Sequence, residues 1–204
     1  MKDNGKDCIR LIHTIPDIGA EAAGPSYSVV RLCQELNALQ QDTTLALLAP
    51  SSTKPFIKSF PHGFGPQRLG CSPSMRRWLN YQVAAGSLDI VHNHSLWMMP
   101  NVYPGWATKG KLVPYIVSPR GTLSEWAMRS GASVKKIFWP LIQKPSINHA
   151  ACFHATAYSE YEDIRRMGFK QPVALIPNGI DLPTFSRGRG DRAVTHRTLL
   201  YLGR

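Results

Sequence analysis

One stretch near the start of the chain limits its fold more than any other. Residues 8–15 form an apolar, β-branched run, a loop with Gly19 and Gly24 follows, and apolar positions then recur at helical spacing over residues 25–36. Pro25 suits a first helical turn, because the N–H that proline lacks has no helical partner there. The pattern predicts a strand, a glycine loop and a helix. A helix N-terminus beside a strand end is either an anion-binding site or an ordinary turn, and these residues leave both open.

The same alternation of strand and helix continues along the chain. We expect further strands within residues 43–49, 89–94, 113–121, 152–157 and 173–181, and helices over residues 75–85 and 160–167 with two more helical segments between 124 and 149. The Pro-, Gly- and Ser-rich residues 50–73 predict an irregular excursion with a short strand near residues 67–69. The whole pattern predicts an α/β fold, a doubly wound Rossmann-like parallel sheet with helices on both faces.

Composition limits the size of the fold and the partners that suit it. With 204 residues and 43% hydrophobic content, the chain can build one full α/β domain. Lys and Arg number 24 against 13 Asp and Glu, so the net charge of +11 favours an anionic partner such as nucleic acid, phospholipid headgroups or a phosphorylated substrate. Cys8, Cys33, Cys71 and Cys152 lack the short spacing of a metal site, and we expect buried free thiols. The sequence shows neither the pattern of a signal peptide nor an apolar run long enough for a spanning helix.

The composition changes near the end of the chain. Residues 1–182 carry the alternating pattern and form the predicted domain, whereas residues 183–197 are rich in Arg, Gly and polar side chains and are expected to form a linker. The apolar residues 198–204 then predict one more strand. We interpret that strand as the first of a second domain, which makes the chain an N-terminal fragment.

A series of short motifs resembles one enzyme family. They are Asp-Ile-Val-His-Asn-His at 89–94, Ser-Pro-Arg-Gly-Thr-Leu at 118–123, Ala-Thr-Ala-Tyr-Ser-Glu at 155–160, Ile-Pro-Asn-Gly-Ile-Asp at 176–181 and Tyr-Leu-Gly-Arg at 201–204. Their order and spacing are similar to those of the family 4, group 1 retaining glycosyltransferases. The resemblance implies a GT-B fold, in which two Rossmann-like domains face each other across a cleft, with the acceptor held mainly by the N-terminal domain and the nucleotide sugar by the C-terminal one.

The resemblance also implies an activity. It is the transfer of a sugar from a nucleotide-sugar donor to a saccharide or lipid-linked acceptor, as in polysaccharide or glycolipid biosynthesis, without a metal or other cofactor. The donor site would be incomplete in these 204 residues, so we expect this chain alone to be inactive.

Arg120 occupies the position that the resemblance makes catalytic. Many relatives have a histidine there, and this chain has arginine in a Ser-Pro-Arg-Gly variant. An arginine stays cationic and cannot act as a general base, so we expect Arg120 to anchor an anionic or hydroxyl-rich group or to stabilise charge on the leaving phosphate. Glu125 and Arg129 follow on the next predicted helix and are expected to orient it.

The resemblance implies several substrate-binding residues, and Glu125 is one of them. Gly24 would let backbone N–H groups approach the donor phosphate or the sugar, or it serves backbone conformation only. Asn93 and His94 would bind sugar hydroxyls, and a buried, satisfied histidine is the other interpretation, which suits His92 better. Asn178 would line the cleft or simply form a turn. The last match, Arg204, would bind the nucleotide diphosphate.

Two other protein classes share some of these features. A dinucleotide-binding oxidoreductase would have the same sheet, but Gly19 and Gly24 are too far apart for its tight glycine turn. A nucleic-acid-binding module would suit the charge, yet the basic residues are scattered and no recognition motif is present. We therefore expect no nucleic-acid partner, and the oligomeric state stays open.

A membrane surface is a further expected partner. Residues 135–144 are basic, aromatic and apolar together, and Arg76, Arg77 and Trp78 form a second basic and aromatic cluster. Such a segment is typical of a helix lying on an anionic membrane, although a packed helix kinked by Pro140 has the same pattern. We expect a cytoplasmic protein that docks peripherally on the inner face of the membrane.

Overall fold

The structure, a computed structural model, describes residues 8–18, 23–49 and 52–182. Within these ranges, seven parallel strands form one sheet in the order β3-β2-β1-β4-β5-β6-β7. The predicted α/β, Rossmann-like parallel sheet is therefore confirmed. The strands are β1 (Arg10–Thr14), β2 (Asp42–Leu48), β3 (Ile57–Phe60), β4 (Ile90–His94), β5 (Tyr115–Ser118), β6 (Cys152–Ala155) and β7 (Val173–Leu175).

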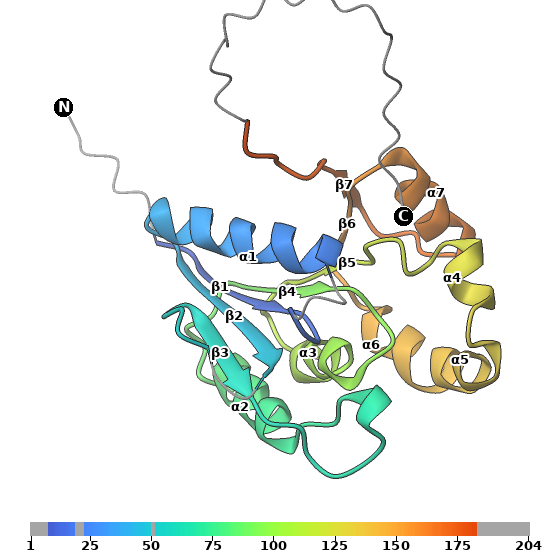
Figure 1. The fold of residues 1–204 in the computed structure, drawn as a ribbon, viewed down its shortest axis with the longest axis horizontal. Helices are drawn as coiled ribbons and strands as arrows, with labels where there is room; N and C mark the ends of the chain where they lie inside the picture. Colours follow the sequence, from blue (N-terminus) through green and yellow to red (C-terminus); the bar gives the residue numbers. More distant parts are fainter. Residues whose placement is uncertain (1–7, 19–22, 50–51, 183–204) are drawn as a thin grey trace, which may run out of the picture.

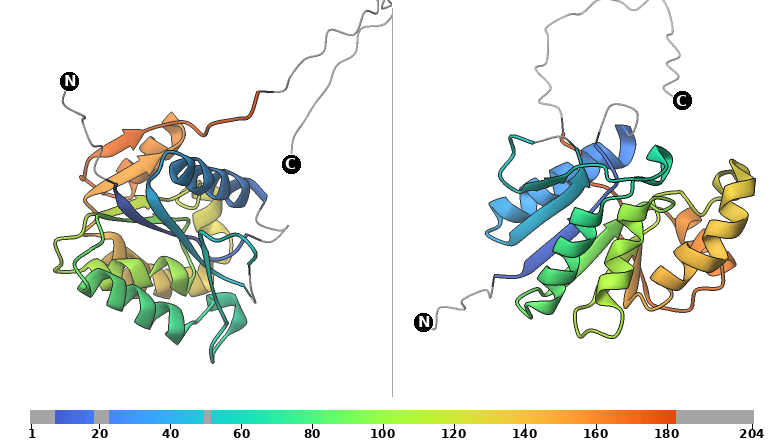
Figure 2. Two further views of the ribbon diagram at one scale, coloured as in Figure 1. Left: turned by 90° about the vertical axis from the view of Figure 1, so that its left-hand side faces the viewer. Right: turned by 90° about the horizontal axis from the view of Figure 1, so that it is seen from below.

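Helices connect the strands on both faces of the sheet (Figures 1 and 2). The strand order reverses between β1 and β4, and because crossovers between parallel strands are right-handed, helices before and after the reversal lie on opposite faces. Figure 1 shows α1 on one face and α2, α3 and α6 on the other. The helices are α1 (Ala23–Ala38), α2 (Pro73–Ala84), α3 (Tyr103–Thr108), α4 (Glu125–Arg129), α5 (Ala132–Phe138), α6 (Lys144–Ile147) and α7 (Tyr158–Arg166), with short turns η2 (Gln67–Leu69), η3 (Met99–Asn101) and η4 (Trp139–Gln143).

The core has two layers, one on each face of the sheet. On the α1 face, Val29 and Cys33 pack against β2 and β3. On the other face, α2 buries Met75, Leu79 and Val83, which are spaced four residues apart and so lie along one side of the helix. This division follows from the strand alternation, which sends successive side chains to opposite faces.

The structure corrects the predicted elements in two places. The short strand expected at residues 67–69 is the turn η2, which begins after Pro66 and ends at Gly70, whose φ is +61°. The strand of this region is instead β3, within the stretch that we expected to be irregular, and it pairs with β2. Its four residues are too few to show a period. The helix α3 was not predicted, because Pro104 and Gly105 give it low helix propensity.

The expectation of buried thiols holds for one cysteine only. Cys33 lies on the buried side of α1, and burial raises the pKa of its thiol to about 12. Cys8 is exposed, and Cys71 and Cys152 are half-buried, because they lie at the start of an element or in a loop rather than within a packed layer. The prediction of four buried thiols is therefore wrong for these three.

Some predictions fall beyond the ranges given above. The linker 183–197, the strand 198–204 and Arg204 lie outside the described residues, so their predicted roles stay predictions. Among the residues that the structure does describe, no helix combines the length and the apolar character needed to cross a membrane.

Candidate functional site

The loops at the carboxyl ends of β1, β4 and β5 meet where the strand order reverses, which is where open α/β sheets bind ligands. In the described ranges, four residues other than glycine have positive φ, and three of them lie in these loops: Ser95 (71°), Trp97 (82°) and Arg120 (55°). This conformation is unfavourable for residues with a side chain, and such strain is concentrated at functional sites. The backbone therefore marks the same edge of the sheet as the sequence motifs do.

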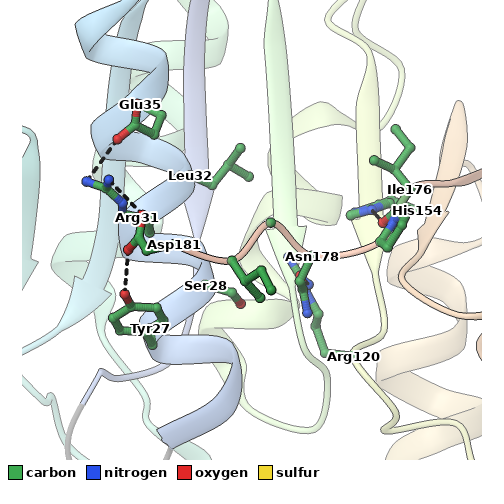
Figure 3. Close-up of a pocket in the computed structure, with 13 residues that line it drawn as sticks. Tyr27, Ser28, Arg31, Leu32, Glu35, Arg120, His154, Ile176, Asn178 and Asp181 are labelled. Carbon is green, nitrogen blue, oxygen red and sulfur yellow. Dashed lines mark hydrogen bonds and ion pairs between the residues drawn. The ribbon is translucent and has the colours of Figure 1, made fainter. Parts of the chain in front are cut away.

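Arg120 extends from the end of β5 into a pocket of about 380 Å³ (Figure 3). One guanidinium nitrogen, Nη1, donates a hydrogen bond to Oδ1 of Asn178, and Nη2 lies 3.4 Å from Nδ1 of His94. The third nitrogen, Nε, is buried and has no hydrogen-bond partner. Burial lowers the pKa of Arg120, and the nearby carboxylate of Glu160 raises it. Arg120 thus carries a half-buried positive charge, with two of its five N–H donors engaged by Asn178 and His94.

The segment 176–181 forms the opposite wall of this pocket and crosses from β7 toward α1 (Figure 3). Asn178 contacts Arg120 near its middle, and Asp181 accepts hydrogen bonds from Tyr27 (2.9 Å) and Arg31 (3.0 Å) at its end. These bonds lower the pKa of Asp181. Sequence analysis did not identify Tyr27, Arg31 or Asp181 as site residues. Their one local signal is the spacing of four residues between Tyr27 and Arg31, which places both on one side of α1.

His94 and Asn93 are buried below the pocket surface. Nε2 of His94 lies 2.9 Å from Nδ1 of His13, and burial lowers the pKa of His94 well below its ordinary range. Asn93 accepts from Thr14 and Asn101 and donates to the carbonyl of Ser95, so it holds the strained loop after β4. Of the two, His94 contacts Arg120, and the predicted contact of either side chain with sugar hydroxyls stays a prediction.

Glu125 and Gly24 lie apart from their expected surroundings. Glu125 forms ion pairs with Arg129 (3.4 Å) and Arg166 (3.7 Å), and the carboxylate that acts on Arg120 is that of Glu160. The expectation that Glu125 and Arg129 orient Arg120 is therefore wrong. Gly24 lies in the first turn of α1 rather than in a loop, and a Cβ there would meet no atom within 4 Å. Its backbone does not require glycine, and its role in ligand approach stays a prediction.

One cluster has the composition of a metal site. His13, His92 and His94 offer ring nitrogens that all lie within 4.8 Å of one another. Burial lowers the pKa of each ring, so all three are neutral near pH 7.

A family model matches most of this chain. Residues 23–179 match the model described as a glycosyl transferase 4-like domain. These residues include α1, every strand after β1, Arg120 and Asn178. No curated protein matches the chain in sequence.

Three solved structures show the same fold at low sequence identity. A glycosyltransferase of Rickettsia africae matches with TM-score 0.54 and 12% identity over 86% of this chain and 44% of its own. A UDP-N-acetylglucosamine 2-epimerase of Listeria monocytogenes matches with TM-score 0.56 and 18% identity over 81% of this chain, and S. aureus MnaA in complex with UDP with TM-score 0.54 and 13% identity over 83%. The chain spans 44% of the length of each of these structures.

Proposed function

Because the chain belongs to the glycosyl transferase 4-like domain family, we propose that it forms the acceptor-binding half of an enzyme that transfers a sugar from a nucleotide sugar. The acceptor is a saccharide or a lipid-linked saccharide, the anomeric configuration is retained, and no metal takes part. The nucleotide-sugar domain lies in the remainder of such an enzyme. One feature of the molecule carries this proposal, the half-buried guanidinium of Arg120, which lines the pocket at the carboxyl edge of the sheet and is held there by Asn178 and His94.

Arg120 suits a reaction in which a nucleoside diphosphate leaves. Negative charge grows on the phosphate oxygen as the bond to the sugar breaks, and a fixed N–H donor in a site of low dielectric stabilises that charge most. Asn178 and His94 hold two guanidinium nitrogens in place, so the group does not have to reorganise during the reaction. The guanidinium remains protonated throughout, and its role is therefore electrostatic rather than that of a base.

The helix α1 lines the same pocket as Arg120, from its second turn onward. Tyr27, Ser28 and Arg31 contribute side chains there, and Arg31 is neutralised by ion pairs with Glu35 and Asp181. A phosphate or a carboxylate would gain from the positive charge of Arg120 and from the hydroxyl groups of Tyr27 and Ser28. This arrangement supports an anionic group on the donor or the acceptor.

The test replaces Arg120 by alanine in the full gene product. We expect kcat/KM for the nucleotide sugar to fall at least about tenfold, which corresponds to about 1.4 kcal/mol of transition-state stabilisation. The melting temperature should fall by only a few degrees, because the exposed Asn178 can bond to water and a single buried acceptor, Nδ1 of His94, loses its donor. Arg129→Ala is the matched control, since that side chain lies on the surface and pairs with Glu125. Unchanged kinetics in Arg120→Ala, or an equal loss in Arg129→Ala, would contradict the proposed role.

We propose in addition that α5 and η4 dock on the cytoplasmic face of an anionic membrane. Val134, Ile137 and Leu141 are 65%, 66% and 71% exposed and lie at spacings of three and four residues, so they form one apolar stripe. Lys136 and Lys144 are exposed on the same two elements. Pro140 lacks the N–H of a regular helix, which accounts for the π turn η4 and leaves the stripe continuous. An apolar stripe with flanking lysines suits a lipid-linked acceptor.

The second predicted basic and aromatic cluster is less suited to membrane contact. The guanidinium of Arg76 lies 4.9 Å from the ring centre of Trp106, and the ring of Trp78 packs against Phe60. Lys135 of the first segment also turns inward, over the ring of Trp97 at 4.8 Å. The docking proposal therefore rests on the apolar stripe and on Lys136 and Lys144.

Cosedimentation with lipid vesicles tests the docking proposal. We expect binding to vesicles rich in phosphatidylserine at low salt and weaker binding at high salt, because each lysine near an anionic surface contributes about 1 kcal/mol that salt screens. Ile137→Glu should abolish it, whereas Leu112→Glu, in an exposed loop remote from η4, should not. Equal and negligible binding to anionic and neutral vesicles would favour a soluble acceptor.

A further inference from the structure

Four of the seven histidines form a row beneath the proposed site. His13 on β1 pairs in register with His92 on β4, His94 follows two residues later on the same face, and His154 lies on β6. Neighbouring ring centres are 4.1 to 5.8 Å apart. Each neutral imidazole has one N–H donor and one acceptor nitrogen, so a donor on one group in this row must face an acceptor on the next.

A first hydrogen-bonded chain leads from Arg120 into this row. Arginine only donates, so Nδ1 of His94 must accept from Arg120, and the proton of His94 is on Nε2. That Nε2–H then donates to Nδ1 of His13 over 2.9 Å. The planes of the two rings are nearly parallel, at 16°, and their centres are 5.2 Å apart. The proton of His13 is therefore on Nε2, which is buried and has no partner.

A second chain runs beside the first and ends on the segment 176–181. The carbonyl of Ile176 can only accept, so His154 donates through Nε2–H over 2.9 Å. Its Nδ1 then accepts from the hydroxyl of Ser118 (2.8 Å), and that hydroxyl oxygen accepts from Nε2–H of His92 (2.7 Å). All four histidines are thus assigned the same tautomer, with the proton on Nε2.

We infer that His13 is a positioning residue for Arg120 and acts through His94. By accepting the proton of His94, it keeps Nδ1 of His94 unprotonated and facing the guanidinium. Arg120 is then held between His94 and Asn178, with its guanidinium in the wall of the pocket. This inference rests on the function proposed for Arg120, but the tautomers that it requires are independent of that function.

The alternative occupant of the cluster is a metal ion. The His13 and His94 nitrogens that would approach a metal are 2.9 Å apart and share a proton instead. Burial is the main cause of the lowered pKa of His94, and the positive charge of Arg120, on the far side of that ring, lowers it further and would also oppose a cation. The geometry therefore favours a proton over a metal between these rings.

The test measures the tautomers of the native chain by NMR with ¹⁵N-labelled imidazoles. We expect all four histidines to carry the proton on Nε2 at pH 7. His94 protonated on Nδ1 would overturn the inference, whether or not the enzyme is active. Binding of Zn²⁺ by the native chain at micromolar concentration, with loss of that binding in His13→Asn, would overturn it as well.

A pair of variants then tests the action of His13 on Arg120. In His13→Asn the amide oxygen can still accept from His94, whereas in His13→Leu no acceptor remains. We expect His94 to keep its tautomer in the first variant and to populate the Nδ1–H form in the second. Ser118→Ala is the matched control, because it breaks the second chain only and should leave His94 unchanged.

Kinetics of the full gene product complete the test. His13→Leu should lower kcat/KM at least about tenfold, since a misplaced charge loses its alignment with the reacting group, and His13→Asn should restore most of it. If the tautomers are as assigned but neither variant affects the reaction, Arg120 is not the reactive group and the proposed function fails. If His94 does not change its tautomer in His13→Leu, the positioning role fails by itself.

Discussion

The approach of α3 to α6 allows one change in stability to be worked from distances. A Cβ added to Gly105 would lie 1.9 Å from the carbonyl oxygen and 2.7 Å from the carbonyl carbon of Ser146. Real Cβ contacts are essentially never shorter than 3.0 Å, so Gly105→Ala must separate the two backbones by about an ångström. Both atoms that collide with the new methyl group belong to backbone, which has no alternative rotamer.

The cost of that separation is expected at the upper end of the range for overpacked cores, about 3 kcal/mol. For a domain of this size, such a loss lowers the melting temperature by about 6–12 °C. The separation of the α3 and α6 backbones should also disturb the functional site. Ser146 is hydrogen-bonded to Gln143, and the side chain of Gln143 accepts from the backbone N–H of the strained Trp97.

Urea denaturation and thermal unfolding of the purified chain measure the effect. Gly24→Ala is the control, because a Cβ there meets no atom within 4 Å and the loss of a helical glycine should stabilise the protein by up to about 1 kcal/mol. If Gly105→Ala lowers the free energy of unfolding by less than about 1 kcal/mol, the backbones of α3 and α6 are not in contact and the expected clash is refuted.

Three further predictions concern pH, the site and activity. Burial lowers the pKa of His13 from 6.5 to about 4, so on acidification this ring is protonated in the unfolded chain before it is protonated in the folded one. The free energy of unfolding should therefore fall by up to about 3 kcal/mol as the pH falls from about 6.5 to 4. Urea denaturation at pH 7 and 4.5 should show a smaller change in the free energy of unfolding for His13→Asn than for the unchanged protein. An equal change in both proteins would contradict the assignment of this pH dependence to His13. Tyr27→Phe removes a hydrogen bond that lowers the pKa of Asp181, so the pKa of Asp181 should rise in this variant. A titration followed by ¹³C NMR of the carboxylate measures the change, and an unchanged pKa would show that the bond is absent in solution. The 204-residue chain alone should turn over no nucleotide sugar, and measurable transfer by it would show that the donor site is complete without a second domain.

The sequence by itself determined the class of fold and the general place of the site. Apolar runs and helical periods are local properties, so the alternation of strand and helix could be predicted from residues a few positions apart. Arg120 and Asn178 were both recognised because each follows a strand within a short motif. Polar residues at strand ends meet at one edge of any parallel sheet, whatever the order of the strands.

Only the tertiary structure decided which of these residues touch. The contact between Arg120 and Asn178 joins positions 58 residues apart, and the contact between Arg31 and Asp181 joins positions 150 apart. Glu160 acts on Arg120 in place of Glu125, which is nearer in sequence but lies on a helix that turns its carboxylate to other arginines. Such choices depend on strand order, register and crossover direction, and local periodicity contains none of these.

The burial of His94 shows the same limit most clearly. A histidine at the end of a strand was expected to meet substrate, and its motif gives no sign that His13, 81 residues earlier, lies beside it. The two rings meet because β1 and β4 are neighbours in the sheet, with His13 paired to His92. Strand pairing is fixed by the packing of the whole sheet, and it places His94 in contact with both His13 and Arg120.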